Sequence, residues 1–149
     1  MWAQWLRRMT PKQKDHLLEV LAERYADELH DAALVEAAAE GLPYEHLRKV
    51  LKRIAARERK HAEWLRAKIR ERGGTPPLPP RLPAAPTWRE VLEAFESEKA
   101  DQVRYLEEAY GADDPELREL LTRIQHEEEE NYRDLLDVVT RMESHAGGA

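Results

Sequence analysis

Two motifs of equal spacing carry most of the chemistry that this sequence suggests. Glu58 and His61 form a Glu-x-x-His motif, and Glu128 and Asn131 form a Glu-x-x-Asn motif 70 residues later. Residues three apart share one face of a helix, and both motifs interrupt rows of Leu and Ile with helical spacing. Carboxylate and imidazole groups facing a protein interior are suitable ligands for a metal ion. The pattern predicts a metal site at mid-length of two packed helices.

Two further stretches place polar residues in their apolar rows. These residues are Glu98, Gln102 and Tyr105 in one stretch, and Glu23, Asp27 and His30 in the other. The predicted inward set holds five carboxylates (Glu23, Asp27, Glu58, Glu98 and Glu128) and no Lys or Arg. Buried carboxylates without counter-charges must protonate, stay hydrated or bind cations. Two divalent metal ions would neutralise four of the five charges; a hydrogen-bonded or partly hydrated polar core is the alternative.

Prolines and glycines divide the chain into four uninterrupted stretches, at about 11–40, 43–72, 87–110 and 115–143. Two stretches begin with the capping-box patterns Thr10-x-x-Gln13 and Thr87-x-x-Glu90. Apolar residues never alternate with a period of two. The sequence predicts an all-α fold of four long helices.

The second half of the chain repeats the first. Stretches 43–72 and 115–143 align with an offset of 70 (Leu47/Leu117, Leu51/Leu121, Ile54/Ile124, Leu65/Leu135), and stretches 11–40 and 87–110 align with an offset of 75 (Val20/Phe95, Leu34/Ala109). We expect two helix hairpins joined by the proline-rich linker of about 73–86. In the polyproline II conformation this linker spans roughly 43 Å, enough to return along a helix of about 30 residues. The predicted architecture is a four-helix bundle with one long crossover; two independent hairpins are the alternative.

The composition and charge of the chain argue against several classes of protein. The chain has 149 residues, which suits one domain over 1–149, and its net charge of −6 argues against nucleic-acid binding. It has no cysteine, no apolar run long enough to span a membrane and no secretion signal, so we expect a cytoplasmic protein.

In the N-terminal segment 1–9, Trp2, Trp5, Leu6 and Met9 share one helical face. We expect this face to cap the bundle or pack in a dimer; a membrane-surface anchor is the alternative.

Over about residues 11–143 the sequence resembles the ferritin-like di-iron carboxylate proteins, in particular their rubrerythrin-like and bacterial ferritin-like branch. The segments that carry the resemblance are AERYADELH, RIAARERKHAEWL, ESEKADQVRY and RIQHEEEENYRDL. The resemblance implies a ferritin-like four-helix bundle in which Glu58 and Glu128 bridge two metal ions. It further implies that Glu23 and His61 complete one metal's ligands, that Glu98 serves the other metal, and that Tyr105 matches a tyrosine beside the family's site.

Asn131 departs from the family pattern, which has a histidine there. An amide oxygen is a weaker ligand, so we expect the second metal to bind less tightly, with Asp27 or His30 as candidate substitutes. The absence of cysteine also excludes a rubredoxin-type electron-transfer domain within this sequence.

The expected function is a metalloprotein, monomeric or homodimeric, that binds iron (di-iron or mononuclear) or manganese. It would act as an oxidoreductase of the oxidase or peroxidase type on oxygen or peroxide. The alternative is a helical scaffold or interaction protein whose site holds no metal.

Overall fold

The computed structural model describes residues 11–81, 84–111 and 114–147, with side chains from 16 to 144 within those ranges. The described residues form four helices: α2 (Pro11–Glu40), α3 (Glu45–Glu71), α4 (Trp88–Gly111) and α5 (Pro115–Gly147). None of the described residues forms a strand. The all-α prediction is therefore confirmed.

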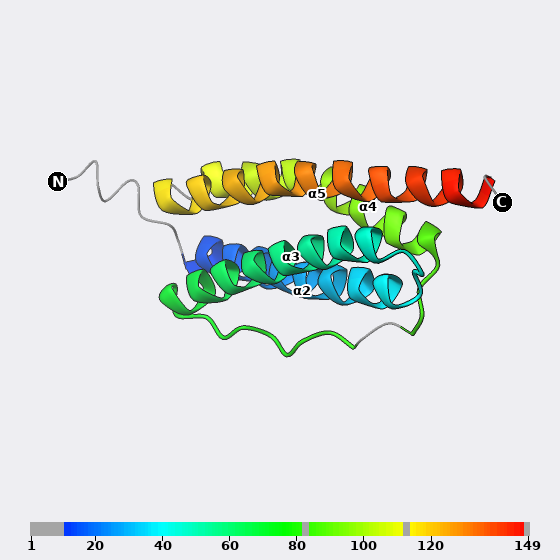
Figure 1. Ribbon diagram of the computed structural model, residues 1–149. Helices are drawn as coiled ribbons and strands as arrows, with labels where there is room; N and C mark the ends of the chain where they lie inside the picture. The colour runs from blue at the N-terminus through cyan, green and yellow to red at the C-terminus, as the bar shows by residue number, and fades with distance from the viewer. Residues whose placement is uncertain (1–10, 82–83, 112–113, 148–149) are drawn as a thin grey trace.

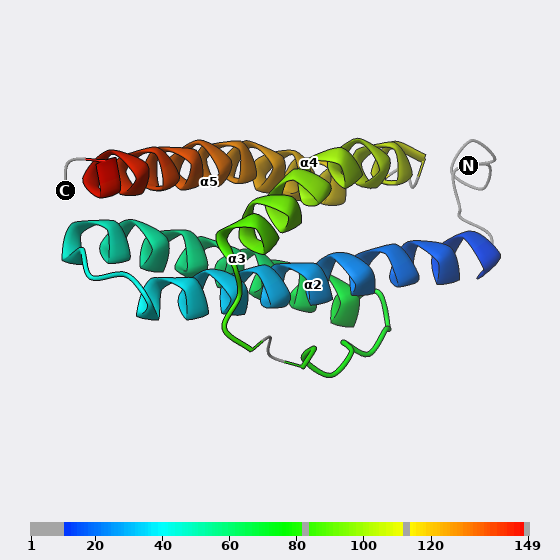
Figure 2. The same ribbon diagram turned by 90° about the vertical axis from the view of Figure 1, so that its right-hand side faces the viewer.

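The helices form one bundle from two hairpins (Figure 1). Helices α2 and α3 make the first hairpin, α4 and α5 the second, and the hairpins meet through α2 with α4 and α3 with α5. The linker from α3 to α4 runs along the outside of the first hairpin (Figures 1 and 2). The linker is thus a crossover, and the alternative of two independent hairpins is wrong.

Local signals explain where three of the helices begin or end. At the start of α4, Thr87 N donates to Glu90 Oε2 and Glu90 N donates to Thr87 Oγ1, both at 3.2 Å, which is the predicted capping box. Asp114 caps α5 by accepting a hydrogen bond from Leu117 N at 3.0 Å. Gly73 follows α3 with φ 80°, a conformation that glycine adopts without strain. The predicted Thr10-x-x-Gln13 capping box and the segment 1–9 fall outside the described residues.

The core consists of two apolar clusters with a polar layer between them. One cluster gathers around Leu47, Leu51 and Phe95, and the other around Leu65, Leu117 and Ile124. The buried polar side chains of the layer come from all four helices: Arg24, Glu28, Asp31, Glu58, His61, Glu98, Gln102, Glu128 and Asn131. Within the described part of the chain, no helix is apolar enough over sufficient length to cross a membrane.

Helix α2 turns a different face inward from the one predicted. Glu23 was expected inside, but its side chain is 58% exposed and pairs with Arg104 at 3.3 Å. Arg24, Glu28 and Asp31 are buried instead. The prediction failed because buried apolar residues lie on a broad surface of α2, which allows more than one choice of central row.

Candidate metal centre

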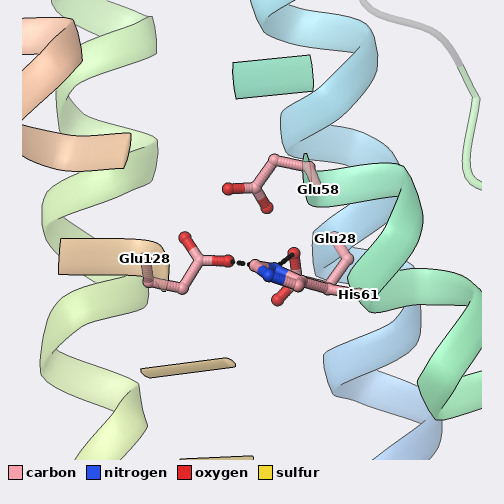
Figure 3. A group of neighbouring side chains, drawn as sticks. All are labelled: Glu28, Glu58, His61 and Glu128. Carbon is pink, nitrogen blue, oxygen red and sulfur yellow. Dashed lines mark hydrogen bonds and ion pairs between the residues drawn. The ribbon is translucent and has the colours of Figure 1, made fainter. Parts of the chain in front are cut away.

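Four buried side chains from three helices converge at the centre of the bundle (Figure 3). They are Glu28 from α2, Glu58 and His61 from α3, and Glu128 from α5, and each offers one ligand atom within 4.8 Å of the others. His61 Nδ1 lies 3.0 Å from Glu128 Oε1 and 3.4 Å from Glu28 Oε2. One imidazole nitrogen and three carboxylates are a donor set that fits iron, manganese or zinc.

A second group of carboxylates adjoins the first and shares Glu58 with it. Asp31 of α2, Glu58 of α3 and Glu98 of α4 each offer one oxygen within 4.8 Å of the others, and all three are buried. A carboxylate that belongs to both groups has the position required of a bridging ligand. The layer therefore contains two adjacent candidate metal positions.

Several buried donor and acceptor atoms of both groups form no hydrogen bond to any described residue. They are Glu58 Oε2, His61 Nε2, both carboxylate oxygens of Glu28 and both of Glu98, although Glu28 Oε1 and Glu98 Oε1 form ion pairs with Arg24. Leaving buried polar atoms without hydrogen bonds is costly, and native proteins rarely do so without a reason. A coordinated cation would satisfy these atoms, so the residues present fit a metal.

Arg24 contradicts the prediction that no cation faces inward. Its guanidinium is 2% exposed and lies 2.9 Å from Glu28, 2.8 Å from Glu98 and 3.7 Å from Glu128. Burial lowers the pKa of Arg24, but the surrounding carboxylates raise it above its ordinary value, so the group is charged. Its spacing of four residues before Glu28, on the same helix face, was the available signal.

The buried carboxylates hold protons more tightly than exposed ones. Burial, followed by the charges of neighbouring glutamates, raises the pKa of Glu58 well above its ordinary value, and burial and the Glu98 charge raise that of Asp31. Burial and the Glu128 charge raise the pKa of Glu98 to about 7, although Arg24 opposes the shift. Without a metal, part of the cluster is therefore protonated near neutral pH.

The pKa of His61 is raised, which favours the charged form of the imidazole. Burial lowers the pKa of His61, but the hydrogen bond to Glu128 and the Glu28 carboxylate 3.4 Å away outweigh burial and raise the pKa to about 9. A metal ligand must be deprotonated at the coordinating nitrogen, so metal binding would displace protons from this histidine as well as from the glutamates.

Asn131 lies in the polar layer, but its amide oxygen is already used. Arg57 Nη1 donates to Asn131 Oδ1 at 3.0 Å, while Asn131 Nδ2 donates to Glu58 Oε1 at 2.9 Å. The amide therefore turns its NH₂ group toward the carboxylates. In this arrangement Asn131 orients Glu58 and offers no oxygen of its own to the centre.

The residues predicted to surround the ligands divide between the interior and the surface. Gln102 and Tyr105 are buried, and Tyr105 Oη donates to Asp27 Oδ2 at 3.2 Å. His30 is 42% exposed and lies 3.4 Å from Asp31 Oδ1. Asp27 and His30 line a pocket of about 200 Å³ between α2 and α4, which reaches Asp31 and Glu98. Neither Asp27 nor His30 belongs to the two ligand groups.

Comparisons with known proteins agree with this architecture. The family model described as "Ferritin-like domain" matches residues 32–144. Among solved structures, the chain is similar to the bacterioferritin of Desulfovibrio desulfuricans, with a TM-score of 0.79 and 20% sequence identity, over 89% of this chain and 83% of that one. That structure is described as showing a diiron site in different catalytic states. Comparison with curated proteins found no match. Because the family model covers most of the chain, including the helices that carry Glu58, His61, Glu98 and Glu128, the protein belongs to the ferritin-like domain family.

Proposed function

We propose that this protein binds iron at the buried centre and uses it for redox chemistry with dioxygen or peroxide. The observation that carries the proposal is the set of buried carboxylate and imidazole atoms in two adjacent groups that lack hydrogen-bond partners among the described residues. The likeness to a bacterioferritin with a diiron site supports iron over manganese, since both ions accept this donor set.

The residues of the chain have distinct roles in this proposal. Glu58 would contribute to both positions, and Glu28, His61 and Glu128 would hold the first metal together with it. Iron, when bound, supplies the one-electron steps that convert dioxygen or peroxide to reduced products. Glu98 and Arg24 lie beside the second position, where the Arg24 guanidinium compensates negative charge at the centre. The protons displaced from His61 and from the glutamates leave as the metal binds.

A metal-free role as a helical scaffold or interaction protein is the second candidate. The observation that favours it is Arg24, because a buried guanidinium already neutralises part of the carboxylate charge. Such a network would need no metal to fold. The two candidates differ in the metal content of the protein, which can be measured directly.

The test is an anaerobic titration of metal-free protein with Fe²⁺, followed by exposure to air in an oxygen electrode. We expect stoichiometric Fe²⁺ binding and oxygen consumption coupled to iron oxidation. Glu128→Gln removes a carboxylate from the centre and should reduce both at least tenfold. Glu130→Gln is the matched control, because Glu130 is on the same helix with a side chain that is 59% exposed.

Two results would contradict the proposal. Iron binding no tighter than that of the Glu128→Gln variant would favour the metal-free scaffold. Tight binding with no oxygen or peroxide consumption would retain the metal site and reject the redox function.

A further inference from the structure

We propose that Asp31 is the terminal ligand of a second, all-oxygen metal position that it forms with Glu58 and Glu98. This inference rests on the proposed function of the centre as a metal site and states how its second position is built. Asp31 replaces the nitrogen ligand that Asn131 does not supply.

Geometry excludes Asn131 from this role and admits Asp31. The Asn131 amide is fixed at both ends, with its oxygen accepting from Arg57 and its nitrogen donating to Glu58. Asp31 lies on α2 one turn after Glu28, is 4% exposed, and brings an oxygen within 4.8 Å of oxygens of Glu58 and Glu98.

Glu58 and Glu98, the partners of Asp31, have carboxylate oxygens that form no hydrogen bond and could coordinate a cation. Glu58 is 0% exposed, and its Oε2 accepts no hydrogen bond from a described residue. Glu98 is 5% exposed, and neither of its oxygens accepts one within the described part of the chain. Arg24 Nη1 contacts Glu98 Oε1 at 2.8 Å, and Glu98 Oε2 forms no hydrogen bond to a described residue. Two buried carboxylates, each with at least one oxygen that forms no hydrogen bond, therefore lie within reach of a cation that Asp31 could also bind.

The charges of the layer support two cations rather than one. The buried carboxylates are Glu28, Asp31, Glu58, Glu98 and Glu128, and the buried guanidinium is Arg24. With His61 neutral, the deprotonated cluster has a net charge of −4. Two divalent ions neutralise that charge, whereas one ion leaves an uncompensated −2 in a buried site. Arg24 offsets the extra carboxylate that Asp31 adds.

The two positions differ in the metals that they prefer. The first contains the imidazole of His61, which suits zinc and cobalt as well as iron, whereas the second contains only carboxylate oxygens, which favour hard ions such as Mn²⁺. The protein should therefore hold two different metals at once. Zn²⁺ added to the Mn²⁺-loaded protein should displace one ion readily and the other only at much higher concentration.

The experiment measures Mn²⁺ binding to metal-free protein by equilibrium dialysis and by electron paramagnetic resonance. We expect two Mn²⁺ per chain, with the spectrum of an exchange-coupled pair. Asp31→Asn should bind one Mn²⁺ and show an uncoupled spectrum. Asp101→Asn is the matched control, because Asp101 lines the same pocket as Asp31, is half-buried, and belongs to neither ligand group. The control should still bind two.

Each outcome decides between the two proposals. Two coupled Mn²⁺ ions in Asp31→Asn would overturn the assignment of Asp31 but keep the metal centre. One Mn²⁺ in the unaltered protein would reject the second position alone, and none would reject the metal centre itself. If Asp31→Asn fails to fold, the Zn²⁺ displacement in the unaltered protein decides: simultaneous loss of both Mn²⁺ ions would contradict a difference in donors.

Discussion

Arg24 Nη1 lies 2.8 Å from Glu98 Oε1, and both side chains are almost completely buried. The pair joins α2 to α4 inside a layer that also contains Glu28 and Glu128 within 3.7 Å of the same guanidinium. A buried ion pair gains little over an apolar pair, but removing one partner leaves the other charge unpaired. The metal-free fold therefore depends on Arg24 more than on any exposed arginine.

Arg24→Met should reduce the free energy of unfolding of the metal-free protein by about 3–5 kcal/mol, because it leaves buried carboxylates without a counter-charge. The loss should be larger at pH 8 than at pH 5, where more of these carboxylates are protonated. Urea unfolding in chelator measures it. The control is Arg104→Met, which breaks the exposed pair with Glu23 and should have a much smaller effect. An equal loss of unfolding free energy in Arg24→Met and Arg104→Met would show that the buried Arg24 contacts stabilise the protein no more than an exposed ion pair.

The metal-free protein should become less stable as pH rises from about 5 to 9. Glu98, with its pKa raised by burial to about 7, and His61, raised by its carboxylate partners to about 9, bind protons more tightly when folded. Their stabilisation is complete below the unfolded pKa values and is lost as pH passes the folded ones. Saturating Mn²⁺ should reverse the trend, since it binds the deprotonated native site. Thermal unfolding across this pH range, with and without Mn²⁺, tests both statements; stability that rises with pH in chelator would refute the first.

Glu58→Gln should stabilise the metal-free protein at pH 8 and abolish stabilisation by Mn²⁺. Burial and neighbouring glutamates raise the pKa of Glu58, so a neutral amide removes a cost while still accepting from Asn131 Nδ2. We expect the melting temperature in chelator to rise by a few degrees, at about 2–4 °C per kcal/mol for a chain of this size. Glu63→Gln is the control, because the Glu63 side chain is 70% exposed. A lower melting temperature for Glu58→Gln would indicate a satisfied hydrogen-bond network rather than a metal site.

Trp64 should report on the first metal position. Its ring centroid lies 5.6 Å from that of His61, so Co²⁺ bound at His61 should quench the Trp64 fluorescence. Titration with Co²⁺ should show a saturable loss of emission that disappears in Trp64→Phe. It should persist in Trp88→Phe, because Trp88 packs against the other apolar cluster. Quenching that survives in Trp64→Phe would place the cobalt elsewhere.

Asn131→His should restore the second metal to the Asp31→Asn variant. The new imidazole would supply the nitrogen ligand of the family pattern beside Glu58, where Asn131 now lies. Equilibrium dialysis should therefore give one Mn²⁺ for Asp31→Asn and two for the double variant. Two ions already present in Asp31→Asn, or one in both proteins, would contradict the exchange of roles between these positions.

The four described helices and the inward rows of α3, α4 and α5 follow from the pattern of residues along the chain. Glu58, His61, Glu98, Gln102, Tyr105, Glu128 and Asn131 are all buried, as their spacing predicted. The apolar residues of each of these helices form a narrow row, so one choice of inward face satisfies the pattern. The internal repeat also contained a signal for Glu28, the candidate ligand that the sequence analysis missed. If stretches 11–40 and 87–110 are aligned with an offset of 70 in place of 75, Glu98 aligns with Glu28. Glu28 then precedes Glu58 by 30 residues, as Glu98 precedes Glu128.

The inward face of α2 and the surroundings of the centre depend on how the four helices pack together. Leu17, Val20, Leu21, Leu34 and Val35 are all buried, so hydrophobicity alone could not choose between the rows that contain Glu23 and Glu28. An arginine is ordinarily exposed. Arg24 becomes stable inside because carboxylates from α2, α4 and α5 converge on it. The direction of the Asn131 amide likewise depends on Arg57 of α3, which lies 74 residues away in the chain.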